Sequence, residues 1–433
     1  MNDSVVVTGI GFLTALGDRQ DAIVKALKGK NSAVGELTGR DYSSMPVKFG
    51  SRIDPAILDS YDLDRIRFKM FKDYVKFGFI ATKNALEDAG LLEGETFDER
   101  YIESRRGMFV STGINGENAE GLFDAFARSE GADGGLDLSL FASRGIPIVH
   151  PMWILSTLSN NLIYFLTSSF GIKGDNNNVT YASSGGGYMI DAAWDSLQQG
   201  QCDVALVTGA DSIINWQAID DLTKSGVLAH DTGVDPVRTM APYTVFAAGA
   251  LPGEGAACLV LEREDAARER GATIYARVLG TALASSGTDH LSPRPDGQET
   301  AQVLESLIGR APSKSFFLLN LNGCSIPAWD RAELKGLSRA LEFPGGSAAV
   351  SRFVCTASKP YFGHTFAASF VIDAAVSALS LHAGFAFGLL ESPSVPEARS
   401  DFCLDYTNSD HGFAITLGQG FGGNTGGVLF GRV

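Results

Sequence analysis

The sequence predicts an α/β fold made of two similar halves. Apolar runs of strand length alternate with helical stretches along the whole chain, a pattern typical of sheets covered by helices. The scheme repeats in the second part of the chain, and 433 residues are enough to bury two cores. We therefore expect an N-terminal half over residues 1–265 and a C-terminal half over residues 266–433.

The expected elements are apolar runs bounded by turn residues. In the first half the strands are Val5–Gly9, Gly107–Ser111, Asn178–Tyr181, Asp203–Gly209 and Ala256–Glu262, and the helices are Lys69–Ala89, Met152–Ser169 and Met189–Gln199. In the second half the strands are Ile274–Leu279, Phe316–Leu321, Phe353–Thr356, Phe413–Leu417 and Gly427–Phe430, and the helices are Arg331–Leu341 and Thr365–His382. Acidic and glycine-rich pieces between Leu92 and Val149 predict surface excursions.

Composition and charge exclude several classes of protein. A net charge of −15 disfavours nucleic acid and anionic membranes as partners. There is no basic segment before the first apolar run and no uninterrupted apolar stretch of about 18 residues, so we expect a soluble cytoplasmic protein. The five cysteines lack CxxC spacing, which argues against a disulfide framework and a zinc site. The glycine-rich runs fit neither GxGxxG nor GxxxxGK[ST], and we expect no cofactor and no metal.

Several separated segments, read in chain order, resemble the β-ketoacyl synthase family. They are Val5–Gly11, Tyr181–Gly187, Leu321–Asp330, Ser358–His364 and Gly418–Asn424. The resemblance runs nearly end to end. It implies a thiolase-like five-layer αβαβα fold, normally dimeric through the strand beside the nucleophile.

Ser183 stands where the family has its nucleophilic cysteine, in Tyr-Ala-Ser-Ser-Gly in place of Thr-Ala-Cys-Ala-Ser-Gly. A strand-to-helix elbow places this residue at the positive end of a helix dipole, which favours a thiolate. A serine hydroxyl is much harder to ionise and needs a positioned base. Ser183 is therefore either an active nucleophile or a small polar filler, and an engineered exchange for cysteine is a third reading.

The resemblance also assigns the other site residues. Asn322 replaces the first of two family histidines, and an amide can donate a hydrogen bond to an enolate oxygen but cannot relay a proton. His364 matches the second histidine and would act as base or as donor to a thioester carbonyl. Lys359, paired with the acidic Glu333, would tune the field at His364. Phe421 would gate acyl entry, and its backbone N–H with that of Ser183 would form the oxyanion hole.

The segment Ala241–Ala257 departs most from an active synthase. The family's Arg-Asp pair is here Ala247-Ala248, and Pro252 precedes the following glycine. This version is similar to the chain length factors of type II polyketide and polyene systems, which are catalytically silent homologues that pair with a synthase. Such factors commonly lose the second histidine too, whereas this chain keeps Lys359 and His364.

A basic helical face is the last candidate site. Arg65, Lys69, Lys72 and Lys76 are spaced by four, three and four residues, with Arg67 nearby, which predicts one side of a helix. In the family a basic patch here receives the acidic acyl carrier protein. The alternative is an ordinary solvated face.

Two functional hypotheses follow. The first is a non-condensing, chain-length-factor-like subunit paired with an active ketosynthase or with a copy of itself, which helps to shape the acyl tunnel. The second is an acyltransferase or thioester hydrolase that uses Ser183 with His364 as its base. In both, the partner is an acyl carrier protein that carries an acyl or malonyl thioester.

Overall fold

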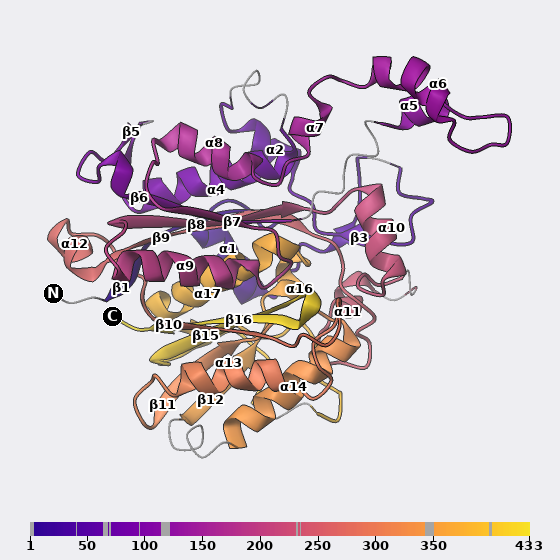
Figure 1. The fold of residues 1–433 in the computed structure, drawn as a ribbon. Coiled ribbons are helices and arrows are strands. Elements are labelled where there is room, and N and C mark those ends of the chain that lie inside the picture. Colours follow the sequence, from indigo (N-terminus) through magenta and orange to yellow (C-terminus); the bar gives the residue numbers. More distant parts are fainter. Residues whose placement is uncertain are drawn as a thin grey trace.

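Ten strands form one hydrogen-bonded sheet that is bent into two stacked layers (Figure 1). In this computed structural model the described residues are 4–39, 41–63, 68, 71–94, 96–113, 122–230, 233, 235–342, 350–397 and 401–433. The strand order is β12-β11-β15-β16-β10-β1-β9-β8-β6-β7. The first-half strands are β1 (Val5–Thr14), β6 (Arg106–Thr112), β7 (Asn176–Val179), β8 (Val204–Ser212) and β9 (Glu254–Arg263). The second-half strands are β10 (Ala276–Ser285), β11 (Ser315–Asn320), β12 (Val350–Thr356), β15 (Phe413–Gly420) and β16 (Asn424–Gly431).

The pairing of strands is the same in both halves. In the first half β9 pairs antiparallel with β1 and β8, and β6 pairs parallel with β8 and β7. In the second half β16 pairs antiparallel with β10 and β15, and β11 pairs parallel with β15 and β12. A short antiparallel contact between β1 and β10 joins the halves. This repeat gives the two similar halves expected of a thiolase-like fold.

Helices cover both faces of the two strand layers (Figure 1). One outer layer holds α4 (Asp73–Asp88) and α8 (Asn161–Phe170), and the other holds α13 (Gln298–Ile308) and α14 (Pro327–Glu342). The central layer holds α9 (Gly185–Gln198) and α17 (Ser369–Ala383), which contact each other and strands of both halves. The result is the five-layer αβαβα arrangement that the resemblance implied.

Helix α17 is buried on all sides, as its apolar sequence requires. The window Phe366–Ala383 is long and apolar enough to cross a membrane, but 89% of it is buried inside the protein. It is the core helix between two strand layers and not a membrane span. All five cysteines are buried, and none of them forms a disulfide.

The expected helix Met152–Ser169 is in fact two helices, α7 (Trp153–Ser156) and α8. The break has a local cause, because the hydroxyls of Ser156 and Thr157 and the amide of Asn161 each donate to a backbone carbonyl. Such bonds compete with a regular helix. The preceding part of the predicted excursion carries α5 (Phe123–Ala127) and α6 (Leu138–Leu140) and projects from the body of the protein (Figure 1).

The remaining elements are short connections around these layers. They are α1 (Gln20–Gly29), β2 (Gly35–Glu36), β3 (Phe49–Gly50), α2 (Pro55–Asp59), β4 (Leu92–Glu93), β5 (Thr96–Phe97), η1 (Glu103–Arg105), η3 (Phe141–Gly145), η4 (Ile146–Ile148), α10 (Trp216–Lys224), α11 (Pro236–Thr239), α12 (Glu264–Glu269), α16 (Lys359–Phe362), η5 (Phe366–Ala368), β13 (Phe385–Ala386), β14 (Thr407–Asn408) and η6 (Phe421–Gly423).

Candidate active site

Ser183 and His364 meet at the N-terminal ends of the two central helices. Ser183 lies in the elbow between β7 and α9, and His364 lies between α16 and the turn η5 that leads into α17. The Ser183 Oγ and the His364 Nε2 are 3.1 Å apart. Each residue is only 1% exposed, so the pair is enclosed by protein.

The backbone fixes the direction of this hydrogen bond. The N–H of Phe366 donates to His364 Nδ1 at 3.1 Å, so Nδ1 carries a lone pair and no proton. In the neutral ring the proton is therefore on Nε2, and the Nε2–H donates to the Ser183 hydroxyl oxygen. His364 thus presents a donor, and not a basic lone pair, to Ser183.

His364 stays neutral in this setting. Burial holds its pKa well below the usual value, and the nearby positive charge of Lys359 lowers the pKa further. The neutral ring with its proton on Nε2 is therefore the form present at physiological pH.

Lys359 does not pair with Glu333, and the prediction of that ion pair is wrong. The Lys359 Nζ instead contacts Asp373 Oδ2 at 2.6 Å, with both side chains 1% exposed. The physical reason is that both Glu333 oxygens already accept hydrogen bonds. The donors are the amides of Asn322 at 2.6 Å and Gly323 at 3.0 Å and the hydroxyl of Tyr243 at 2.7 Å.

The loop that presents Asn322 is held by two buried carboxylates of α14. Glu333 accepts from the amides of residues 322 and 323, and Asp330 Oδ1 accepts from those of Cys324 and Ser325, each at 3.2 Å. Burial and the neighbouring Glu333 raise the pKa of Asp330 to about 7, and burial also raises the pKa of Glu333. The loop geometry therefore depends on α14 and not on Lys359.

The side chain of Asn322 is fully buried, and its amide oxygen has a hydrogen-bond partner whereas its amide nitrogen has none among the described residues. Its Oδ1 accepts from the backbone N–H of Gln419 at 3.1 Å, which fixes the orientation of the amide. Its Nδ2 has no hydrogen-bond partner among the described residues. Asn322 thus holds a buried donor that is free to bind an acceptor atom of a ligand.

Phe421 follows the end of β15, which lies directly against the Ser183 elbow. A Cβ placed on Gly420 would be 2.6 Å from Ser184 Oγ, and one on Gly418 would be 2.7 Å from the Ser183 carbonyl oxygen. Only glycines allow this approach of the strand to the elbow. Phe421 is thereby placed at the site, as the sequence predicts, while the oxyanion role of its amide stays a prediction.

The loop with Ala247 and Ala248 lies beside the Asn322 loop, because Gly249 N donates to the Ser325 carbonyl at 2.9 Å. Val245, Phe246 and Ala248 are exposed. This loop therefore carries no charge of its own where an Arg-Asp pair would place two, although the Arg238 guanidinium lies over the Phe246 ring at 4.1 Å.

The basic face is described only in part. Arg65, Arg67 and Lys69 lie outside the described residues. Lys72 is the N-cap of α4 and not part of the helix, and Lys76 in its first turn forms an ion pair with Asp73 at 2.7 Å. The carrier-docking role of this face stays a prediction.

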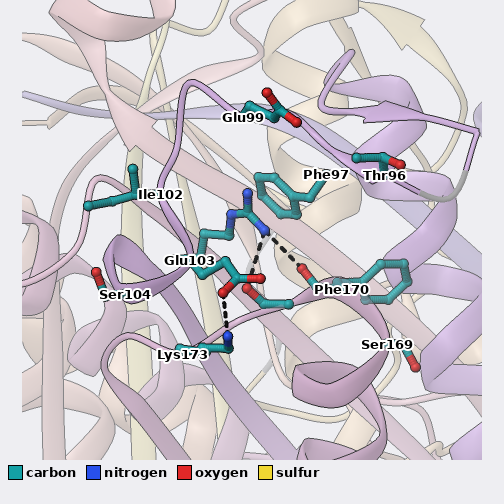
Figure 2. Close-up of a pocket in the computed structure, with 11 residues that line it drawn as sticks. Thr96, Phe97, Glu99, Ile102, Glu103, Ser104, Ser169, Phe170 and Lys173 are labelled. Carbon is teal, nitrogen blue, oxygen red and sulfur yellow. Dashed lines mark hydrogen bonds and ion pairs between the residues drawn. The ribbon is translucent and has the colours of Figure 1, made fainter.

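Other parts of the described chain offer weaker candidates. A surface hollow of about 680 Å³ lies beside β5 and η1. Figure 2 shows the residues that line it. Its Arg106 donates to the carbonyls of Tyr101, Phe170 and Gly171, and its Lys173 pairs with Glu103, so these three charged groups are satisfied within the protein. Among the described residues there is no group of three or more His, Cys, Asp or Glu side chains placed to hold a metal ion.

Four residues that build the site were not singled out from the sequence. Asp373, Asp330, Tyr243 and Gln419 hold Lys359 or the Asn322 loop. Asp373 had a usable signal, since it is a lone acidic residue in an apolar helix and such a charge needs a buried partner. The roles of the other three depend on backbone contacts that sequence does not reveal.

Both halves of the chain match models of known protein families. Residues 2–267 match the family described as "Beta-ketoacyl synthase, N-terminal domain", and residues 275–391 match "Beta-ketoacyl synthase, C-terminal domain". The 3-oxoacyl-[acyl-carrier-protein] synthase 2 of Vibrio cholerae is 25% identical over 444 residues, covering 99% of each chain. The chloroplastic 3-oxoacyl-[acyl-carrier-protein] synthase I of Hordeum vulgare is 25% identical over 432 residues, covering 98% of this chain and 88% of the other.

Solved structures share the fold over the whole chain. The ishigamide ketosynthase/chain length factor has a TM-score of 0.82 at 21% identity, covering 100% of both chains. A β-ketoacyl synthase from Burkholderia phymatum STM815 has a TM-score of 0.82 at 22% identity, covering 99% of both. The AntDE:AntF complex, a type II polyketide acyl carrier protein with its ketosynthase, has a TM-score of 0.81 at 19% identity, covering 100% of both.

Proposed function

The chain belongs to the β-ketoacyl synthase family, and from this premise we propose that it is a non-condensing subunit that pairs with an active ketosynthase in the cytoplasm. Its setting is fatty acid or type II polyketide biosynthesis, with acyl carrier protein as the partner that delivers the thioester. Within that setting its role is like that of a chain length factor, which shapes the acyl tunnel and leaves bond formation to the partner.

The direction of the Ser183–His364 hydrogen bond carries this proposal. A serine attacks a thioester only when a base takes its proton as it attacks. The ring nitrogen facing Ser183 already carries a proton, because the amide of Phe366 occupies the other nitrogen. Lys359 further disfavours a positively charged His364, which is the form that proton abstraction would create.

The other altered positions support the same reading. Asn322 can donate a hydrogen bond but cannot relay a proton for decarboxylation. Ala247 and Ala248 leave the neighbouring loop without charge. Retention of Lys359 has a structural explanation, since Lys359 compensates the buried charge of Asp373.

The surface supports a protein partner. Large apolar side chains are exposed along the projecting segment and around helix α7, which follows it: Phe123, Leu136, Leu138, Ile146, Ile148, Met152, Ile154 and Leu155. Apolar exposure on this scale is typical of protein interfaces. The edge strand β7 leads directly into the Ser183 elbow, and within the described part of the chain it pairs with β6 alone, so its other edge is available to a strand of a partner.

Two variants of matched chemistry test the partner. Ile154→Glu, at 55% exposure on the projecting face, should abolish co-purification with a co-expressed active ketosynthase. Ile102→Glu, at 60% exposure away from that face, should leave co-purification intact. Equal behaviour of the two variants would contradict the proposed interface.

A condensation assay tests the missing chemistry. The purified chain alone, given acyl- and malonyl-loaded carrier protein, should form no 3-oxoacyl product, whereas the co-purified pair should form it. The chemistry should depend on the partner's nucleophile and be unaffected by Ser183→Ala. Product formed by the chain alone would overturn the non-condensing role, and Ser183-dependent loss of thioester would favour the acyltransferase reading.

A further inference from the structure

The site is closed by aromatic rings on the side of Phe421. Ser183 and His364 are 1% exposed and Asn322 is fully buried, so a ligand reaches them only if a covering group moves. Phe366 and Trp329 are 5% and 4% exposed, while Phe421 is half-buried. Phe421 is therefore the member of this group that lies nearest to solvent.

Four rings form a continuous series of contacts that begins at the site. The Phe366 ring lies 4.2 Å from the His364 ring, measured between centroids. The Phe421 ring lies 6.3 Å from that of Phe366 and 6.1 Å from that of Trp329. The planes of Trp329 and Phe421 are at 87°, which is the favourable edge-to-face geometry.

The two buried rings, those of Phe366 and Trp329, belong to segments that hydrogen bonds hold in place. Phe366 has a φ of +43°, a strained value for phenylalanine, and its N–H is bound to His364. The next residue, Ala367, is held through its amide by Asp211 and through its carbonyl by Ser111. Trp329 lies in α14, immediately before the Asp330 carboxylate that binds the site loop.

Phe421 is placed on a short turn that contains two glycines. It begins the three-residue connection between β15 and β16, and Gly422 and Gly423 follow with φ of +74° and +65°. Glycine changes between such conformations without a Cβ penalty. Hydrogen bonds hold the turn on both sides: Asn424 Nδ2 donates to the Phe421 carbonyl at 2.8 Å and Gly422 N to the His290 carbonyl at 3.0 Å. Ser286 donates through its N–H to the Gly423 carbonyl at 3.2 Å and through its Oγ to the Gly422 carbonyl at 3.3 Å, so most of these bonds are to the glycines and not to Phe421.

We propose that Trp329 is the fixed wall against which Phe421 closes, so that this tryptophan determines how readily a ligand reaches Ser183. The edge-to-face contact stabilises the closed position of Phe421. Loss of one such contact shifts a closed-to-open equilibrium by roughly two- to tenfold. The proposal concerns access alone and does not rest on the proposed non-condensing role.

Alkylation of a cysteine probe measures this access directly. In a Ser183→Cys protein the thiolate displaces iodide from iodoacetamide, and peptide mass spectrometry follows the thioether at residue 183. Adding Trp329→Leu should raise that rate roughly two- to tenfold, with a smaller rise for Trp329→Phe. Phe421→Ala should give the largest rise. Trp194→Leu, a half-buried tryptophan of α9, is the matched control and should leave the rate unchanged.

Alkylation of two buried native cysteines shows whether a faster reaction at residue 183 comes from opening of the site or from a general loss of packing. Cys324 and Cys258 are both fully buried, and Cys324 belongs to the same apolar cluster as Trp329. The proposal requires that Trp329→Leu accelerate alkylation at residue 183 and leave both native thiols protected. An unchanged rate at residue 183, or an equal rise at all three thiols, would overturn it. Neither reagent nor readout involves a partner or acyl transfer, so a failed outcome leaves the proposed function to its own tests.

Discussion

The buried ion pair between Lys359 and Asp373 is the most exacting test of how the site is held. The two charged atoms are 2.6 Å apart and both side chains are 1% exposed, so neither charge reaches water. Asp373→Asn leaves a buried ammonium group without its counter-charge, which costs about 3–5 kcal/mol of the free energy of unfolding. Lys359→Met leaves the carboxylate unpaired and should cost a similar amount.

The double variant makes the reasoning refutable. Lys359→Met with Asp373→Asn removes both charges, and a neutral pair in such a site is within roughly 1 kcal/mol of the original or more stable. Urea titrations of the four proteins measure this coupling. The exposed pair Lys224–Asp220, with side chains 73% and 35% exposed, is the matched control, and Asp220→Asn should cost far less than either buried single variant because water screens this pair. Single variants that cost no more than this control, or a double variant as unstable as the singles, would refute the account.

Three further substitutions test single residues through the stability of the protein. Tyr243→Phe removes a 2.7 Å hydrogen bond to Glu333 and should lower the free energy of unfolding by about 1.5–3 kcal/mol; a urea titration showing less than 0.5 kcal/mol would contradict the role of this bond. Burial raises the pKa of Glu254 to about 7, so the folded state holds its proton more tightly than the unfolded chain, and its stabilising contribution is lost as pH rises from about 4.5 to above 7. The stability of Glu254→Gln relative to the parent should therefore increase over this range, and a constant difference between the two urea titration series would exclude the effect. Gly422→Ala places a side chain at a φ of +74° and should lower the free energy of unfolding by about 1–2 kcal/mol. A variant that unfolds on heating at the same temperature as the parent, or at a higher one, would contradict this expectation.

The fold was largely predictable from the sequence because its signals are periodic and repeated. Each expected strand of both halves lies within or overlaps an observed strand of the ten-stranded sheet. The errors are at places where side chains compete with the backbone. The split between α7 and α8 comes from hydroxyl and amide donors, a local effect that apolar periodicity over Met152–Ser169 does not detect.

The site was predictable in its members but not in its connections. The motifs place Ser183, Asn322, His364 and Phe421 together, because each follows a strand of the repeated sheet. The partner of Lys359 was predicted wrongly, since pairing depends on which carboxylate is already satisfied by backbone amides. The direction of the Ser183–His364 bond depends on one amide, that of Phe366, which no sequence pattern reports.

The central claim is that Ser183 is not acylated, and the intact mass of the protein tests it most directly. The purified chain is incubated with acyl- and malonyl-loaded carrier protein beside a Ser183→Ala control, and release of carrier thiol is followed in the same samples so that a fast hydrolase is also detected. The donor character of His364 toward Ser183 predicts no mass increase and equal thiol release in both proteins. A serine-dependent acyl adduct, or thiol release that Ser183→Ala abolishes, would contradict the account and make this chain an acyl-transfer enzyme.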